Sequence, residues 1–402
     1  MKPYLAALLA LAAFLAAAAP AADAPPAHDM GKMWQASLAR PALSVGASFD
    51  ANGRLWLAQV AGGILSVSHS DDRGKTFSAA VKVNAEPENI AADGENRPKI
   101  RVAKNGNIYV AYTQSLDKPF SGNIRFSRST DGGQSFSVPL TVNDNRDIIS
   151  HRFDALGVND RGQIYLAWLD KRDGSTAAAQ GGQYAGAATY YALSDDGGAS
   201  FSANRKAADH SCECCRVAMA MDKDGTPVIL WRHIYGKNVR DHALLRLDGK
   251  SAPSRASSDG WEIDACPHHG PALSIGADGV YHLAWFTNAP QRKGLFYTHS
   301  ADGGKTYSTA LPFGNFDAQA GHADVLSSGK AVYLAWKEFD GENAVVYLMA
   351  SHDGGTSWAA PRKLATSADN SDHPLLITDG KRIYLSWNTL KEGYRLIEVA
   401  TQ

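Results

Sequence analysis

The chain has 402 residues, of which 44% are hydrophobic and 20% are charged, so it can build a large core and is not a disordered polypeptide. Forty Lys and Arg residues against 41 Asp and Glu residues give a net charge of -1, which excludes an overall electrostatic attraction to nucleic acid or to an anionic membrane. Only four cysteines occur, too few for a disulfide scaffold, yet all of them lie between Cys212 and Cys266.

The N-terminal residues have the layout of a secretory signal. Lys2 supplies a positive charge, residues 5–19 are apolar, and Ala19-Pro20-Ala21 provides small residues for cleavage. The apolar run is too short to span a membrane. We therefore expect a signal peptide at residues 1–21, a linker at 22–31 and a single domain at 32–402, and a periplasmic or secreted protein with no membrane span.

A strand-like pattern recurs seven times along the rest of the chain. Each copy ends in an aliphatic and aromatic group, as in Tyr333-Leu334-Ala335-Trp336, and follows an apolar anchor residue. The anchors are Leu43, Ile100, Leu156, Met219, Leu273, Val325 and Leu376. Their spacing runs from 51 (325 to 376) to 63 (156 to 219), which is enough for about four short strands and is typical of a propeller blade.

A second repeat has the form Ser-x-Asp-x-Gly-x-(Thr/Ser)-aromatic. Its five copies span residues 70–77, 129–136, 194–201, 300–307 and 351–358. The Asp carboxylate can accept hydrogen bonds from backbone N–H groups across a turn, and the Gly can adopt the positive φ angle that such a turn requires. The aromatic side chain packs beneath the turn. The chain thus resembles the sialidase-like Asp-box (BNR-repeat) β-propellers. The resemblance covers the whole predicted domain and places the boxes on outer hairpins, away from the channel.

We predict an all-β propeller of seven four-stranded blades, with six blades as the alternative because that number is familiar from sialidases. The unit at residues 219–261 keeps the strand pattern but lacks the box. The seventh unit stops after three strands' worth of residues. Residues 32–38 are available as its fourth strand, which would close the ring by pairing the two ends of the chain and leave no open sheet edge.

Basic side chains recur three or four residues before each anchor, where the inner strand of a blade meets the channel mouth. They are Arg40, Arg97, Arg152, Arg216, His269, His322 and His373. The resemblance implies that the arginines, Arg40, Arg97, Arg152 and Arg216, bind a substrate carboxylate through bidentate pairs. It also implies a catalytic Asp and a Tyr nucleophile activated by a Glu. Asp170 and Tyr394 are the nearest candidates, and neither has a diagnostic position.

Sulfur and imidazole donors gather before the fourth and fifth inner strands. Because these segments are one repeat apart, we expect them to meet at the channel mouth together with the rim histidines. The predicted metal ligands are His210, Cys212, Cys214, Cys215, Cys266, His268, His269, His322 and His373. Such a soft donor set favours copper, with zinc as the second candidate. One or more disulfides among the four cysteines is the alternative interpretation.

The leading hypothesis is therefore an exported, monomeric, non-enzymatic propeller that handles copper, with a transition metal ion and another exported protein as its partners. The first alternative is a sialidase-like exo-glycoside hydrolase with an arginine clamp. The second is a thiol redox or protein-docking module.

Overall fold

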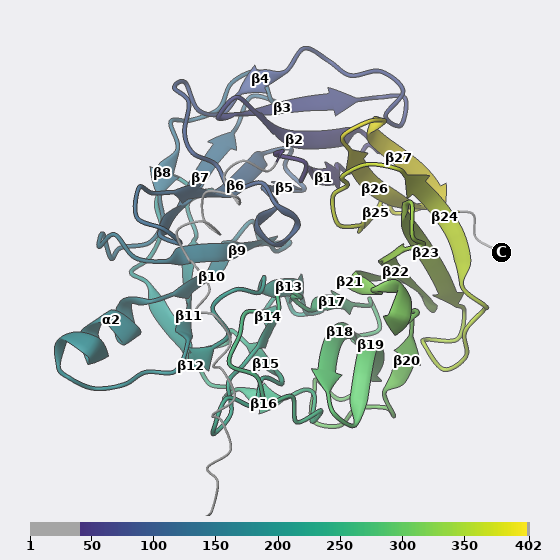
Figure 1. Cartoon of the computed structure of the whole chain (residues 1–402). Helices are drawn as coiled ribbons and strands as arrows, with labels where there is room; N and C mark the ends of the chain where they lie inside the picture. The colour runs from purple at the N-terminus through teal and green to yellow at the C-terminus, as the bar shows by residue number, and fades with distance from the viewer. Residues whose placement is uncertain (1–40, 400–402) are drawn as a thin grey trace, which may run out of the picture. The chain divides into compact units, whose positions relative to one another are not determined.

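The computed structural model describes residues 41–399, which form seven antiparallel sheets in a ring, with the first strand of each sheet nearest the centre (Figure 1). The predicted all-β, seven-bladed propeller is confirmed, and the six-bladed alternative is wrong. The signal peptide, the linker, the closing strand at 32–38 and Arg40 lie outside the described residues. Within residues 41–399, no helix is long and apolar enough to cross a membrane.

The first four blades each contain four strands. Blade 1 comprises β1 (Gly46–Phe49), β2 (Leu55–Ala61), β3 (Ile64–Ser70) and β4 (Val81–Lys82). Blade 2 follows the short helix η1 (Gly94–Asn96) and comprises β5 (Lys99–Val102), β6 (Ile108–Ser115), β7 (Gly122–Ser129) and β8 (Leu140–Thr141). Blade 3 comprises β9 (His151–Val158), β10 (Ile164–Asp170), β11 (Ala187–Ser194) and β12 (Arg205–Ser211), with α2 (Arg172–Ala179) at its outer edge (Figure 1). Blade 4 comprises β13 (Ala218–Met221), β14 (Pro227–Arg232), β15 (His242–Arg246) and β16 (Ser254–Arg255).

The last three blades continue the same order. Blade 5 comprises β17 (Ala272–Ile275), β18 (Tyr281–Ala289), β19 (Arg292–Ser300) and β20 (Leu311–Phe313). Blade 6 follows η2 (Phe316–Ala318) and comprises β21 (Gly321–Ser328), β22 (Ala331–Phe339), β23 (Ala344–Ser351) and β24 (Arg362–Ser367). Blade 7 has three strands among the described residues, β25 (Leu375–Thr378), β26 (Ile383–Thr389) and β27 (Gly393–Val399).

The core lies between neighbouring blades. Second strands such as β10 are buried along their whole length, because both faces of the sheet pack against another blade. The repeated aromatic of the sequence pattern is the tryptophan of these strands, and Trp168, Trp231, Trp336 and Trp387 are among the largest fully buried side chains. Trp168 of blade 3 shares one cluster with Phe126 of blade 2. The apolar repeat therefore joins adjacent sheets into one ring.

The Asp-boxes staple the turn between the third and fourth strands of five blades. In each, the Ser hydroxyl donates to the Asp at 2.7–2.8 Å and accepts the amide of the glycine four residues after the Ser at 2.8–2.9 Å. A Cβ added at Gly133 of blade 2 would lie 2.6 Å from Trp56 of blade 1, and one at Gly198 of blade 3 would lie 2.6 Å from Phe126 of blade 2. The glycine is thus required because the preceding blade fills its side-chain space.

The ring closes between blades 7 and 1 through Asp372, just before β25. Its carboxylate accepts the Ser44 hydroxyl at 2.7 Å and the Val45 amide at 3.2 Å. It also binds both terminal nitrogens of Arg97, with Nη2 at 3.1 Å from Oδ1. The Asp372 side chain is fully buried and the Arg97 side chain is nearly so. Three blades therefore meet on one carboxylate.

We expect Asp372→Asn to lower the free energy of unfolding by about 3 kcal/mol, because it leaves the Arg97 guanidinium buried without its charged partner. Urea denaturation followed by tryptophan fluorescence measures this change. The matched control is Asp117→Asn, since Asp117 is exposed. Equal stability of the two variants would contradict the role of Asp372 in ring closure.

Candidate functional site

A buried carboxylate occupies the centre of the ring where the chain enters the inner strands. Glu95 lies in η1, whose first turn is capped by the Asp93 side chain, and is only 4% exposed. It accepts the Arg216 amide at 2.9 Å, the Arg216 guanidinium at 2.8 Å and the Gly270 amide at 2.9 Å. Burial opposes ionisation of Glu95, but the Arg216 and His322 side chains and the Arg216 amide together hold its pKa well below the usual range.

Three stacked imidazoles surround this carboxylate. The ring centroids of His269 and His322 are 4.4 Å apart, and those of His322 and His373 are 3.5 Å apart. The Nδ1 atoms of His322 and His373 lie 3.6 and 3.7 Å from a Glu95 oxygen. Burial lowers the pKa of all three, that of His269 to about 2, so the stack is neutral at physiological pH.

Arg97 and Arg216 both line a cavity of about 160 Å³ between the inner strands, but their guanidinium groups are held by other groups of the protein. Arg97 binds Asp372 and the His373 carbonyl, and Arg216 binds Glu95 and the Ala323 carbonyl. Arg152 is buried, with its guanidinium 4.8 Å from the centroid of the Phe153 ring. Two of the four candidates thus already have carboxylates of the protein as partners, and substrate binding by this group stays a prediction.

Blade 1 corrects the alignment that selected Arg40. Its inner strand begins at Gly46, and Ala47 pairs with Leu57 as Ile100 pairs with Val110 in blade 2. The anchor is therefore Ala47 and not Leu43. The ring position in this blade belongs to Ser44, whereas Arg40 lies outside the described residues.

A cavity of about 950 Å³ opens beside the imidazole stack, between the loops of blades 5, 6 and 7. It is bounded by η2, the end of β22 and the segment that precedes β25. The side chains on its wall include His269, His322, Phe286, Phe316, Phe339, Lys337, Asp317, Glu338, Glu342 and Asp369. Apart from the two histidines, sequence reasoning missed this set, because the loops carry no repeat.

Glu338 is the most firmly held of the cavity carboxylates. Its Oε1 accepts the Trp336 indole N–H at 2.7 Å and the Asn315 amide at 2.7 Å. The sequence signal is an acidic residue two positions after a repeated tryptophan. Asp170 has the same relation to Trp168 but is fully buried and paired with Arg172, so it faces no cavity.

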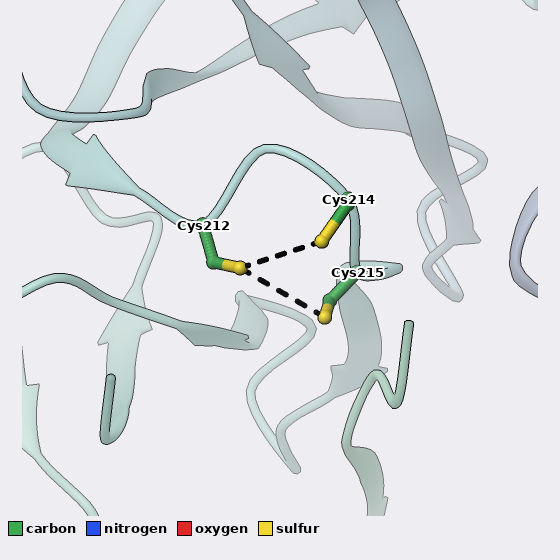
Figure 2. Close-up of side chains that lie close together, drawn as sticks. All are labelled: Cys212, Cys214 and Cys215. Carbon is green, nitrogen blue, oxygen red and sulfur yellow. Dashed lines mark hydrogen bonds between the residues drawn. The ribbon is translucent and has the colours of Figure 1, made fainter. Parts of the chain in front are cut away.

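The four cysteines form a separate cluster. The sulfur of Cys212 lies 3.7 Å from that of Cys214 and 4.0 Å from that of Cys215, and all three residues are buried (Figure 2). Cys214 also forms a compact group with Cys266 and His268.

The nine predicted metal ligands are therefore divided. The four cysteines form the thiol cluster, and His268 lies beside Cys214 and Cys266. Three other histidines form the imidazole stack next to Glu95, a residue that the sequence pattern did not indicate. His210 belongs to neither group, since it is exposed and stacks on Tyr184 with ring centroids 4.7 Å apart. Tyr394 lies against Phe77 with ring centroids 5.9 Å apart and does not line the cavity.

Comparison with solved structures finds this fold in carbohydrate-active propellers. A PL25 ulvan lyase bound to -[GlcA(1-4)Rha3S]- matches with a TM-score of 0.55 at 11% identity, covering 89% of this chain and 94% of that chain. Polysaccharide lyase Uly1 gives 0.55 at 9% identity, with 88% of each chain covered. A leech intramolecular trans-sialidase gives 0.50 at 11% identity, with 86% and 83% covered. No family model and no curated protein sequence matches the chain.

These matches confirm the sialidase-like propeller fold and correct the functional expectation. The prediction of a non-enzymatic copper-handling protein is wrong: the structures that share this fold are those of carbohydrate-processing enzymes. The physical reason for the error is that the predicted ligands do not form one site at the channel mouth.

Replacing Glu95 by Gln should lower the free energy of unfolding by about 3 kcal/mol near neutral pH, because the Arg216 guanidinium loses its buried counter-charge. The folded-state pKa of Glu95 lies below its unfolded value of about 4.3, so this contribution is present above that pH and is lost as pH falls. Urea denaturation at about pH 7 and about pH 3.5 should therefore show the difference from wild type narrowing in acid. The exposed Glu86→Gln is the control; a difference that is independent of pH would contradict the assignment.

Proposed function

We propose that the protein is a glycoside hydrolase whose substrate binds in the cavity between blades 5, 6 and 7. The observation that carries the proposal is the combination of carboxyl groups and accessible aromatic rings on one cavity wall at the mouth of the ring. Most glycoside hydrolases use two carboxyl groups on either side of the scissile bond, one acting as acid and the other as base or nucleophile. The cavity has four acidic side chains from which to supply them.

The aromatic side chains suit the apolar face of a sugar ring. Phe286 and Phe316 are stacked with centroids 6.4 Å apart, and Phe286 stacks on His269 at 4.1 Å. Phe316 and Phe339 are 37% and 45% exposed, which is unusual for large apolar groups unless they bind something. We assign these rings to the substrate subsites.

The charge of the cavity favours a neutral glycan. Its four carboxylates are opposed by Lys337 alone, because burial keeps the neighbouring imidazoles neutral. An acidic sugar would have to enter against this charge, since Arg97 and Arg216 are engaged with Asp372 and Glu95. The substrate class therefore differs from that implied by an arginine clamp.

Glu338 is assigned as one of the two reacting carboxyl groups. Two hydrogen bonds fix its Oε1 and leave Oε2 for the substrate, which gives the orientation that proton transfer or nucleophilic attack requires. Asp317, Glu342 and Asp369 are exposed on the same wall, and we assign the second group to this set.

The test is hydrolysis of neutral polysaccharides and neutral aryl glycosides, measured as release of reducing ends or aglycone. Glu338→Gln keeps an Oε1 acceptor for Trp336 and Asn315 but loses the ionisable group, so kcat/KM should fall at least about 100-fold with no change in stability. Glu86→Gln should keep full activity.

Acidic glycans distinguish the alternatives. Polyuronates and sialosides should be poor substrates if the cavity charge governs selection. Turnover of acidic glycans alone, or equal activity of Glu338→Gln and wild type, would overturn the proposal.

A further inference from the structure

The thiol cluster lies apart from the proposed glycan cavity and is built from the two loops that flank blade 4. Cys212, Cys214 and Cys215 belong to the turn between β12 and β13. Cys266 belongs to the segment between β16 and β17, at the other end of the same blade. Blade 4 also lacks the Asp-box that staples its two neighbours. The cluster is therefore placed where it can join the beginning and end of that blade.

The spacing of three of the sulfurs matches that of thiolates bound to one metal ion, and the Cys266 sulfur lies within 4.8 Å of that of Cys214. Four sulfurs at about 2.3 Å from a zinc ion in tetrahedral geometry are separated by about 3.8 Å. The measured separations from Cys212 are 3.7 Å to Cys214 and 4.0 Å to Cys215 (Figure 2). A disulfide would require about 2.05 Å, so each pair would have to move by well over 1 Å to form one.

The surroundings of the cluster supply the charge that bound thiolates need. Arg240 donates from Nη1 to the Cys212 sulfur at 3.0 Å, and its Nε is held by the Ile263 carbonyl at 2.9 Å. Arg152 and Arg232 are close enough to act electrostatically on the cysteines. A zinc ion with four thiolates carries a charge of about -2, which two of these guanidinium groups balance.

We propose that Cys212, Cys214, Cys215 and Cys266 bind one structural zinc ion that ties together the two ends of blade 4. Cys212, Cys214 and Cys215 form the buried floor of the site. Cys266 lies on the exposed side next to Cys214, and its side chain would move inward to complete the four-sulfur shell once the ion has entered. A closed four-sulfur shell has no open position for substrate, so the ion stabilises the fold and takes no part in glycan cleavage.

The experiment measures metal content, thiol protection and the cobalt spectrum of the full chain. Protein purified under reducing conditions and equilibrated with equimolar zinc should retain about one zinc per chain after desalting, by elemental mass spectrometry. Cobalt in place of zinc should give thiolate-to-cobalt charge-transfer absorption and the visible bands of a tetrahedral site. Zinc should also protect all four cysteines from alkylation and raise the thermal midpoint.

Single variants identify the ligands. Cys215→Ser and Cys266→Ser should each weaken zinc binding by more than about 100-fold, which exceeds the effect of losing a neighbouring hydrogen bond. His210→Ala is the matched control, because it is two residues from Cys212 but outside the cluster, and it should bind zinc like wild type. If Cys215→Ser fails to fold, alkylation of the wild-type protein with and without zinc still tests the site.

Three results would overturn the inference. They are the absence of bound zinc, alkylation that zinc does not slow, and full zinc binding by Cys266→Ser. A finding that the wild-type protein cleaves no glycan would not overturn the zinc proposal, because no residue of the proposed hydrolase site is a zinc ligand.

Discussion

The whole ring depends on the neutralisation of one buried carboxylate at its centre. Glu95 comes from the loop before blade 2, yet its partners Arg216, Gly270, His322 and His373 stand at the starts of blades 4, 5, 6 and 7. Burial of a carboxylate costs free energy unless its oxygens are hydrogen-bonded and its charge is balanced. The positions of these partner residues are therefore constrained by the need to satisfy Glu95. Five of the seven blades are therefore held in one angular arrangement by a single side chain.

This arrangement also positions the cavity. His269 and His322 are members of the stack that surrounds Glu95 and are at the same time part of the cavity wall. The inner end of the proposed glycan site is therefore as rigid as the centre of the ring. The outer wall is different, because Phe316 in η2 and Phe339 at the end of β22 are partly exposed to solvent. Binding residues that stand on a rigid scaffold are common.

The fold could be predicted from the sequence because its determinants are local and repeated. The buried tryptophans and the Asp-boxes recur in blade after blade, so each copy supports the others. The site could not be predicted in the same way, because Glu95 and Phe316 lie in short helices between blades, where no period applies. Glu338 does follow a repeated tryptophan, but that position is acidic in only some blades. The choice of Leu43 as the first anchor has a similar origin, since only strand pairing shows that the equivalent position in blade 1 is Ala47, four residues later. The cysteines were recognised as a group, but their separation from His322 and His373 depended on packing between blades.

The contact between Arg97 and Asp372 joins positions 275 residues apart in the chain. The contacts that blade 7 makes with blades 1 and 2 cannot form until nearly the entire polypeptide has been synthesised. Closure of so long a loop carries a large entropic cost before any contact repays it, and topologies of this kind fold slowly. During that interval the early blades expose unpaired strand edges and a buried-charge network without its counter-charges. Unpaired strand edges of this kind favour aggregation of folding intermediates, so pairing of the final blade removes a hazard that the earlier blades carry.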